Sequence, residues 1–200
     1  MQSEQQVTKL KNKPKRHIPS GASPLSKYSR NRANLAIRRA NYQDMPTIAG
    51  FISSSADWYR KFVDPKDMDQ HEVDQEWIDD NFFRREFFLG VDGDTPVGTV
   101  TLQTLGEDAY LGYVYLDAKH VGKGFGHQLM DHAKKISKER GLEGMVLIAH
   151  PQAKWATKAY EKYGFECIAR KKEDVLSWND GALKPYYEEG FHLYRYPIHP

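Results

Sequence analysis

Apolar residues beyond position 34 follow two different spacings, and these spacings divide the chain into strands and helices. Short runs in which every second residue is apolar, or in which all residues are apolar, predict strands. Such runs lie at 35–40, 86–91, 97–105, 109–116, 145–149, 165–170 and 190–196. The sequence Asp92-Gly93-Asp94 provides the turn between the second and third strands.

Four segments place apolar residues three and four positions apart, which predicts helices. The first begins after Asp44, a capping residue, with Pro46 in its first turn, and ends at the serines 53–55. The others cover residues 68–83, 125–140 and 153–163, and Gly141 ends the third.

The order of these elements predicts an α/β fold with a mixed sheet packed between helices. One strand and two helices are followed by three strands, then by a helix, a strand, a helix and the last two strands. Residues 145–149 are all apolar, which is typical of a central strand covered on both faces. We expect residues 34–200 to form one domain, because this length is sufficient to bury a core.

Residues 1–33 differ in charge and composition from the rest of the chain. They carry eight Lys or Arg and one acid, Glu4, whereas residues 34–200 carry 21 basic and 26 acidic side chains. Few large apolar residues and no clear period predict a disordered, basic tail. The tail is either a solvated arm or a surface for nucleic acid, the ribosome or an acidic partner. Tyr28 is its one aromatic residue, so base stacking has little support.

Several classes of protein are excluded by composition. The longest apolar run is about five residues, against the roughly 20 that a membrane helix needs. The polar start predicts no secretory signal, so we expect a cytoplasmic protein without a membrane partner. The single cysteine, Cys167, excludes an internal disulfide and a cysteine-based zinc cluster, and no other metal-ligand cluster is apparent.

A glycine-rich segment between a predicted strand and a predicted helix carries the strongest chemical signal. In residues 116–126, glycines at 122, 124 and 126 leave the backbone amides unobstructed. The following helix adds its free amides and the positive end of its dipole, which suits a pyrophosphate group. The alternative is an ordinary strand-to-helix turn without a ligand, because such a turn can have the same composition. The spacing matches neither common nucleotide-binding fingerprint.

Two linked motifs resemble the GNAT superfamily of N-acetyltransferases. The segment 121–126, Val-Gly-Lys-Gly-Phe-Gly, is similar to the family's coenzyme A motif, Gln/Arg-x-x-Gly-x-Gly/Ala, with Val121 at the first position. The second motif places Ala156, Tyr160, Gly164 and Phe165 at the family's spacing, with Ala153 where an Asn often opens the helix. The resemblance covers about residues 34–197 and implies a mixed, mostly antiparallel sheet flanked by helices on both faces.

The resemblance implies roles for particular residues. Acetyl-CoA is the expected co-substrate, without a metal. Its pyrophosphate would bind the amides of the glycine segment, and the Leu116 amide would pair with pantetheine and polarise the thioester. The expected coenzyme-binding residues are Leu116, Val121, Gly122, Lys123, Gly124, Phe125 and Gly126. Tyr160 stands where similar enzymes place the general acid; a core-facing tyrosine is the alternative.

The base and the acceptor site are less defined. An alkylammonium with a pKa near 10.4 costs about 4.6 kcal/mol to deprotonate at pH 7, so a base or a water relay is useful. His150 is the first candidate, with Glu86, Asp117 or water as alternatives. Family members wall the acceptor site with the first two helices and the last hairpin. Here these elements offer Trp58, Tyr59, Tyr187 and Glu188, and also Trp178, Tyr186 and Glu189.

The leading hypothesis is an N-acetyltransferase that acts on a primary amine of a small molecule or amino acid. A protein lysine or N-terminal acetyltransferase is the nearest alternative. A non-catalytic acyl-CoA-binding module with an RNA-binding tail comes from another class. The sequence leaves the oligomeric state open, with a dimer as one option, and does not distinguish acetyl from longer donors.

Overall fold

The computed structural model describes residues 34–66, 68 and 73–198, and these contain one mixed sheet. The predicted basic tail, residues 1–33, lies outside the described residues. Eight strands pair in the order β1-β2-β3-β4-β6-β8-β7, and β5 pairs with β3 beside β4. Their bounds are β1 Ala36–Arg39, β2 Glu86–Asp92, β3 Thr95–Leu105, β4 Asp108–Leu111, β5 Tyr115–Leu116, β6 Gly144–Ala149, β7 Glu166–Ala169 and β8 His192–Pro197.

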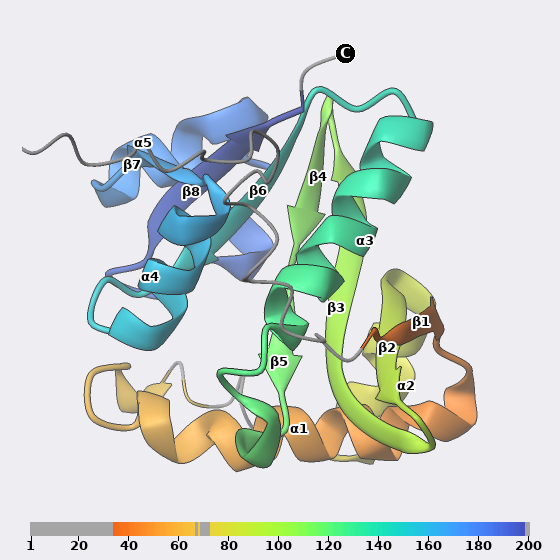
Figure 1. The fold of residues 1–200 in the computed structure, drawn as a ribbon. Helices are drawn as coiled ribbons and strands as arrows, with labels where there is room; N and C mark the ends of the chain where they lie inside the picture. The colour runs from red at the N-terminus through yellow and green to blue at the C-terminus, as the bar shows by residue number, and fades with distance from the viewer. Residues whose placement is uncertain (1–33, 67, 69–72, 199–200) are drawn as a thin grey trace, which may run out of the picture. The chain divides into compact units, whose positions relative to one another are not determined.

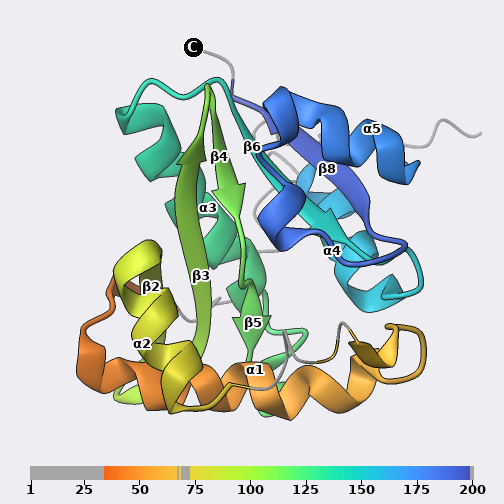
Figure 2. The same ribbon diagram turned by 180° about the vertical axis from the view of Figure 1, so that it is seen from behind.

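Helices cover both faces of this sheet, as predicted (Figures 1 and 2). The α-helices are α1 Met45–Tyr59, α2 Gln75–Arg84, α3 Phe125–Glu139, α4 Lys154–Tyr163 and α5 Lys172–Ser177. Helices α3 and α4 lie on one face, whereas α1, α2 and α5 lie on the other (Figures 1 and 2). Short 3₁₀ helices cover Tyr42–Asp44, Ala118–His120, Trp178–Gly181 and Lys184–Tyr186.

Strand β6 shows why this order of layers is stable. Met145 and Leu147 pack in the core cluster that contains Phe125 and Leu129 of α3. Val146, between them, packs in the cluster of Val175, which belongs to α5. Successive side chains of a strand point to opposite faces, so a fully apolar strand requires cover on both faces. The central position predicted for 145–149 is therefore confirmed.

The first predicted helix has different ends in the structure. The side chain of Asp44 does not cap α1; it accepts a hydrogen bond from the Asn41 amide at 2.8 Å and pairs with Arg38. The helix also continues past the serines to Tyr59. The serines do not end it, since the Ser54 and Ser55 hydroxyls donate to the Phe51 carbonyl and so have partners inside the helix.

The second predicted helix starts later, and a further helix was missed. Helix α2 begins at Gln75, where the carboxylate of Asp74 accepts a hydrogen bond from the Trp77 amide at 2.8 Å. Residues 69–72 of the predicted span lie outside the described residues. Helix α5, Lys172–Ser177, is short and polar, with Val175 as its buried residue, so its apolar period was too brief to detect.

The strand predicted at 109–116 is interrupted by a β-bulge. Leu102 pairs with Leu111 and Thr99 with Tyr115, so two residues of β3 face the three residues 112–114. The Tyr113 amide donates to the Thr101 hydroxyl at 2.9 Å instead of to a strand carbonyl. A Cβ at Gly112 would lie 2.6 Å from this hydroxyl, so only glycine fits there.

The sheet opens beside this bulge. Strands β4 and β6 form its single parallel pair, and their register covers only 108–110 against 144–146. Beyond these residues β5 stays paired with β3, whereas β6 stays paired with β8 as far as Ala149. The two strands diverge in both views (Figures 1 and 2). We call this place the strand gap, between β5 and the Leu147–Ala149 end of β6.

The described residues contain neither a membrane-spanning helix nor a candidate metal site. None of the helices there has the length and apolar character to cross a membrane. No group of three or more His, Cys, Asp or Glu side chains in the same part of the chain is placed to hold a metal ion.

Candidate active site

The glycine segment forms a loop whose amides are available for a ligand. Gly122 and Gly124 have φ values of 84° and 87°, and Gly124 is the N-cap of α3. None of the amides of residues 121–126 donates a hydrogen bond to another residue that the structure describes. A Cβ at Gly122 would meet open space. The side chain of Phe125 is buried, so this residue offers only its backbone. Such a loop at a helix N-terminus suits an anionic group.

The backbone of Leu116 faces the strand gap. Asp117 donates its amide to the Val97 carbonyl at 3.0 Å, and Tyr115 pairs with Thr99. Hydrogen bonding alternates along an antiparallel pair, so the amide and carbonyl of Leu116 point away from β3. They therefore point toward β6, on the side where the predicted pantetheine arm would lie.

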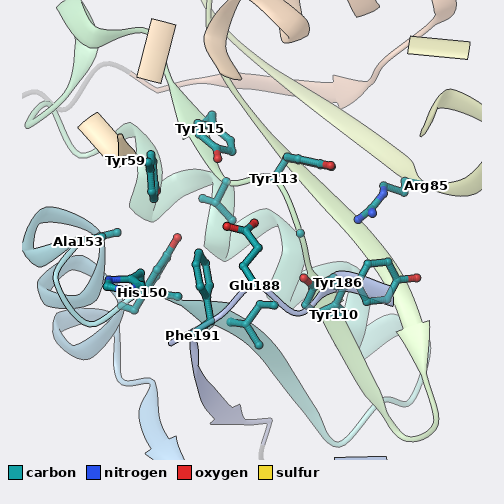
Figure 3. Close-up of a pocket in the computed structure, with 16 residues that line it drawn as sticks. Tyr59, Arg85, Tyr110, Tyr113, Tyr115, His150, Ala153, Tyr186, Glu188 and Phe191 are labelled. Atoms are coloured by element: carbon teal, nitrogen blue, oxygen red, sulfur yellow. The ribbon is translucent and has the colours of Figure 1, made fainter. Parts of the chain in front are cut away.

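A pocket of about 80 Å³ lies at the strand gap, with lining residues from both faces of the sheet, and we call it the central pocket. It is lined from the α4 side by Ala156 and Tyr160 and from the opposite face by Tyr110 and Tyr186. Sixteen residues line it, ten of which are labelled in Figure 3: Tyr59, Arg85, Tyr110, Gly112, Tyr113, Val114, Tyr115, Ile148, Ala149, His150, Ala153, Ala156, Tyr160, Tyr186, Glu188 and Phe191.

Glu188 places a carboxylate in the central pocket among tyrosines. In Figure 3 its side chain extends into the pocket, between His150 and Arg85. The charge of Glu188 raises the pKa of Tyr59, Tyr110 and Tyr115, after burial as the main cause. The pKa of Tyr59 reaches about 12, although a hydrogen bond with Tyr115 lowers it. These phenols are therefore neutral donors at physiological pH.

Tyr160 lies where the sequence placed it, on α4 and in the wall of the central pocket. Its ring packs edge-on against Phe165 at 6.0 Å, and it borders the core under α3. Burial raises the pKa of its phenol well above the ordinary value, and the neighbouring Tyr59 and Tyr110 add to this. The hydroxyl is therefore protonated throughout the neutral range.

His150 also lines the central pocket, at the end of β6, but its ring is partly engaged. The Gln152 amide donates to Nδ1 at 3.2 Å, and the ring stacks on Phe62 at 4.7 Å. Burial and the nearby His192 lower its pKa, so the ring is neutral at pH 7. A neutral ring that accepts at Nδ1 carries its proton on Nε2, which makes it a donor toward the pocket.

The two weaker candidates for the base lie outside the central pocket. Glu86 forms a bidentate ion pair with Arg140, at 2.6 and 2.9 Å, which lowers the pKa of its carboxyl group. Asp117 accepts a hydrogen bond from the Lys119 amide, and this bond lowers its pKa. Both carboxylates are thus held by other parts of the fold.

The predicted acceptor residues divide into two groups. Tyr59 and Glu188 line the central pocket, whereas Trp58 and Tyr187 do not. Trp58 packs edge-on against Trp155 at 5.6 Å, and the Tyr187 hydroxyl accepts a hydrogen bond from the Gly190 amide. Glu189 forms an exposed ion pair with Lys172 at 2.7 Å.

Arg85, Gly112 and Phe191 line the central pocket but were not singled out from the sequence. Arg85 directly follows the last residue of α2, and a cation at a helix C-terminus is common for reasons unrelated to a pocket, so its position in the sequence does not single it out. Gly112 was a detectable signal, because a glycine within an aromatic strand often marks a bulge. Phe191 lies within the predicted strand 190–196 and directly before β8, and no local pattern there indicates a pocket.

Comparisons with known proteins define the class. Residues 52–165, more than half of the chain, match the acetyltransferase (GNAT) family. The chain therefore belongs to this family, as its motifs suggested. It is an acyl-CoA-dependent N-acetyltransferase, which acetylates an amine. A search among curated protein sequences found no match.

Many solved structures share the fold. The PaiA N-acetyltransferase of Thermoplasma acidophilum, solved with coenzyme A, has 18% identity and a TM-score of 0.65, over 82% of this chain and 98% of that one. A Bacillus subtilis acetyltransferase with CoA has 18% identity and a TM-score of 0.59, over 82% and 99%. The N-acetylglutamate synthase of Neisseria gonorrhoeae, with CoA and N-acetylglutamate, has 14% identity and a TM-score of 0.61, over 83% and 35%.

Proposed function

We propose that this chain transfers an acetyl group from acetyl-CoA to a primary amine of a small molecule or amino acid in the central pocket. The observation that carries the proposal is that the pocket lies where β4 and β6 stop pairing and is lined from both faces of the sheet. The glycine loop lies at the N-terminus of α3, which covers one face, and Glu188 belongs to the pocket wall together with Tyr110 and Tyr186, which line it from the other face. Donor and acceptor can therefore approach the same point from opposite sides.

The donor is held by backbone groups in this proposal. The amides of 121–126 bind the pyrophosphate, since no other described residue accepts from them. The Leu116 backbone pairs with the pantetheine arm across the strand gap. Its amide also hydrogen-bonds the thioester oxygen, where negative charge develops as the amine attacks. Acetyl-CoA supplies the acyl group and a thiolate leaving group.

Glu188 is the proposed partner of the acceptor ammonium group. A carboxylate in a pocket of neutral phenols attracts a cation strongly, because little water screens the interaction. An ammonium group carries three protons: one stays on the amide product, one reaches the sulfur, and one is released. Glu188 takes the released proton directly or through water, which offsets the cost of forming the neutral amine.

Tyr160 supplies the proton for the sulfur as the carbon–sulfur bond breaks, and it recovers a proton from the attacking nitrogen. Its raised pKa supports this role in one respect, since the hydroxyl is always available as a donor. His150 was predicted to be the base. Its engaged Nδ1 favours a second role for it, in which Nε2 donates to the acceptor or to a bound water.

The proposal is tested by thiol release from acetyl-CoA with a panel of amines and lysine peptides. Glu188→Gln keeps the shape of the side chain and removes its charge, and we expect kcat/KM to fall about 100-fold or more. Glu189→Gln is the matched control, an adjacent exposed carboxylate, and should stay within about twofold.

Three results would decide against parts of this proposal. CoA binding by calorimetry without thiol release from any amine would favour the non-catalytic module. Turnover confined to peptides would favour a protein acetyltransferase. A larger loss in His150→Gln than in Glu188→Gln would assign the base to His150.

A further inference from the structure

Arg85 is a fixed cation in the wall of the central pocket. Its Nε donates to the Asn81 side-chain oxygen at 2.8 Å and its Nη1 to that of Gln103 at 3.1 Å. Both partners are neutral. Arg85 forms no ion pair with any carboxylate in the described part of the chain. The guanidinium is thus oriented by protein groups while its charge is left uncompensated.

Two tyrosine rings pack against the guanidinium group of Arg85, and a glycine leaves space for it. Its central carbon lies 4.9 Å from the ring centres of both Tyr113 and Tyr186. Each ring is fixed in turn, because the Tyr113 hydroxyl accepts from Trp77 and the Tyr186 hydroxyl accepts from Gln103, both at 3.2 Å. A Cβ at Gly112 would lie 2.9 Å from Nη1, so the bulge glycine makes room for Arg85.

The central pocket therefore contains two opposite charges at different places. Glu188 lies toward its middle and Arg85 beyond Tyr113 in Figure 3. The charges act in opposite directions on the pKa of Tyr110, which lies within reach of both. A simple alkylamine would satisfy Glu188 and leave Arg85 without a counterion. Planar, bidentate recognition of an oxyanion is what a preorganised guanidinium does best.

We propose that the acceptor is an amine that also carries an oxyanion, a carboxylate or a phosphate, and that Arg85 binds this group. The inference rests on the proposed function, since it assigns the second half of the same substrate. The ammonium lies at Glu188 and the anionic end at Arg85, so the pocket selects both the charge and the length of the acceptor.

Matched substrates test this inference. Thiol release is compared for amino acids of increasing chain length, aminoalkyl phosphates, and bare alkylamines of the same length. We expect at least a tenfold higher kcat/KM for the anionic member of the best pair, mainly through KM. The carboxylate and phosphate series show which oxyanion is preferred. Equal kcat/KM for anionic and bare amines of every length would overturn the inference and leave the proposed function standing.

Variants locate the effect at Arg85. Arg85→Gln should reduce the anionic preference to about one, and Arg85→Lys, which keeps the charge but loses the fork, should restore part of it. Arg84→Gln is the matched control, an adjacent exposed residue paired with Asp80, and should keep the preference. A preference that persists in Arg85→Gln would overturn the inference.

Thiol release from no amine would instead contradict the proposed function. The inference would then be decided by calorimetry of the same anionic amines in the presence of CoA. Weaker binding to Arg85→Gln than to Arg84→Gln would support it, and equal binding would overturn it.

Discussion

At the scale of single residues, the central pocket is a group of phenols whose protonation is fixed by their surroundings. Tyr110, Tyr115 and Tyr160 all have raised pKa values, and burial is the main cause for each. They are protonated in the resting enzyme at any physiological pH, so none of them is available as the base that first deprotonates the acceptor. The carboxylate of Glu188 is thus the anionic group that reaches this part of the pocket.

The Tyr160→Phe variant removes the hydroxyl and keeps the ring, so it tests the role of the hydroxyl alone. The ring contact with Phe165 remains, so folding and CoA affinity should change little. Loss of the donor should lower kcat by about 10²–10⁴-fold, with a smaller effect on KM, because the proton is needed only as the thioester breaks. The measurement is steady-state turnover with the best acceptor.

Tyr163→Phe is the control on the same helix. Its hydroxyl bonds to Asp131 and lies outside the central pocket, so turnover should stay near wild type. A Tyr160→Phe enzyme within threefold of wild type, with chemistry rate-limiting, would make Tyr160 a packing residue.

At the scale of elements, local patterns predicted the helices and strands better than their exact shape. Strand β6 and helix α3 have strong periods over their whole length, so their bounds were close to those predicted. The bulge at 112–114 depends on pairing with β3, which no pattern within 109–116 contains. The serines 53–55 likewise did not end α1, since the hydroxyls of Ser54 and Ser55 bond inside the helix, which the sequence alone does not show.

The bulge has a direct effect on the site. Tyr110 and Tyr115 are five residues apart, so on a regular strand they would face opposite sides. Their partners on β3, Gln103 and Thr99, are four apart and share one face. The extra residue therefore brings both tyrosines into the central pocket. Sequence analysis placed them in one strand but could not assign them to one face.

The glycine loop gives a prediction for an element. Gly122→Val introduces a side chain at φ 84°, where L-residues are strained, and it obstructs the amides on either side. We expect the Kd for CoA to rise at least about tenfold, which is 1.4 kcal/mol. Isothermal titration calorimetry with CoA measures this directly.

Gly141→Val is the matched control for this strain. Gly141 has φ 70°, a Cβ there also meets open space, and it lies at the opposite end of α3. Both variants should lose similar stability, but only Gly122→Val should lose CoA affinity. Equal affinities in the two folded variants would remove the loop from the donor site.

At the scale of the whole molecule, sequence analysis gave the layers and the donor motif but not the assembly of the central pocket. Arg85, Tyr110 and Glu188 are more than 100 residues apart at their extremes, and only the order of strands brings them together. A family motif predicted Tyr160 because its spacing is local. The position of Arg85 in the pocket depends on how the strands pair, and no local sequence pattern indicates it.

The basic tail should be dispensable for the reaction. Residues 1–33 contain too few large apolar side chains to form a core of their own. A shortened chain that begins at Arg32 should keep its Tm within a few degrees and its kcat/KM with a small amine within about twofold. Thermal unfolding and thiol release measure these. A large loss of either would show that the tail supports the domain or its site.

The strand gap also has a consequence for how such a protein diversifies. In our proposal, the donor is held by the backbone of residues 116–126, whose amides and carbonyls need the glycines to stay accessible but do not read other side chains. The acceptor is held by the side chains of Arg85 and Glu188, on separate segments of the chain. Mutations in those segments can change which molecule is modified while the coenzyme is handled as before. Related proteins can thus evolve to use new acceptor substrates while the transfer of the acetyl group from the coenzyme stays the same.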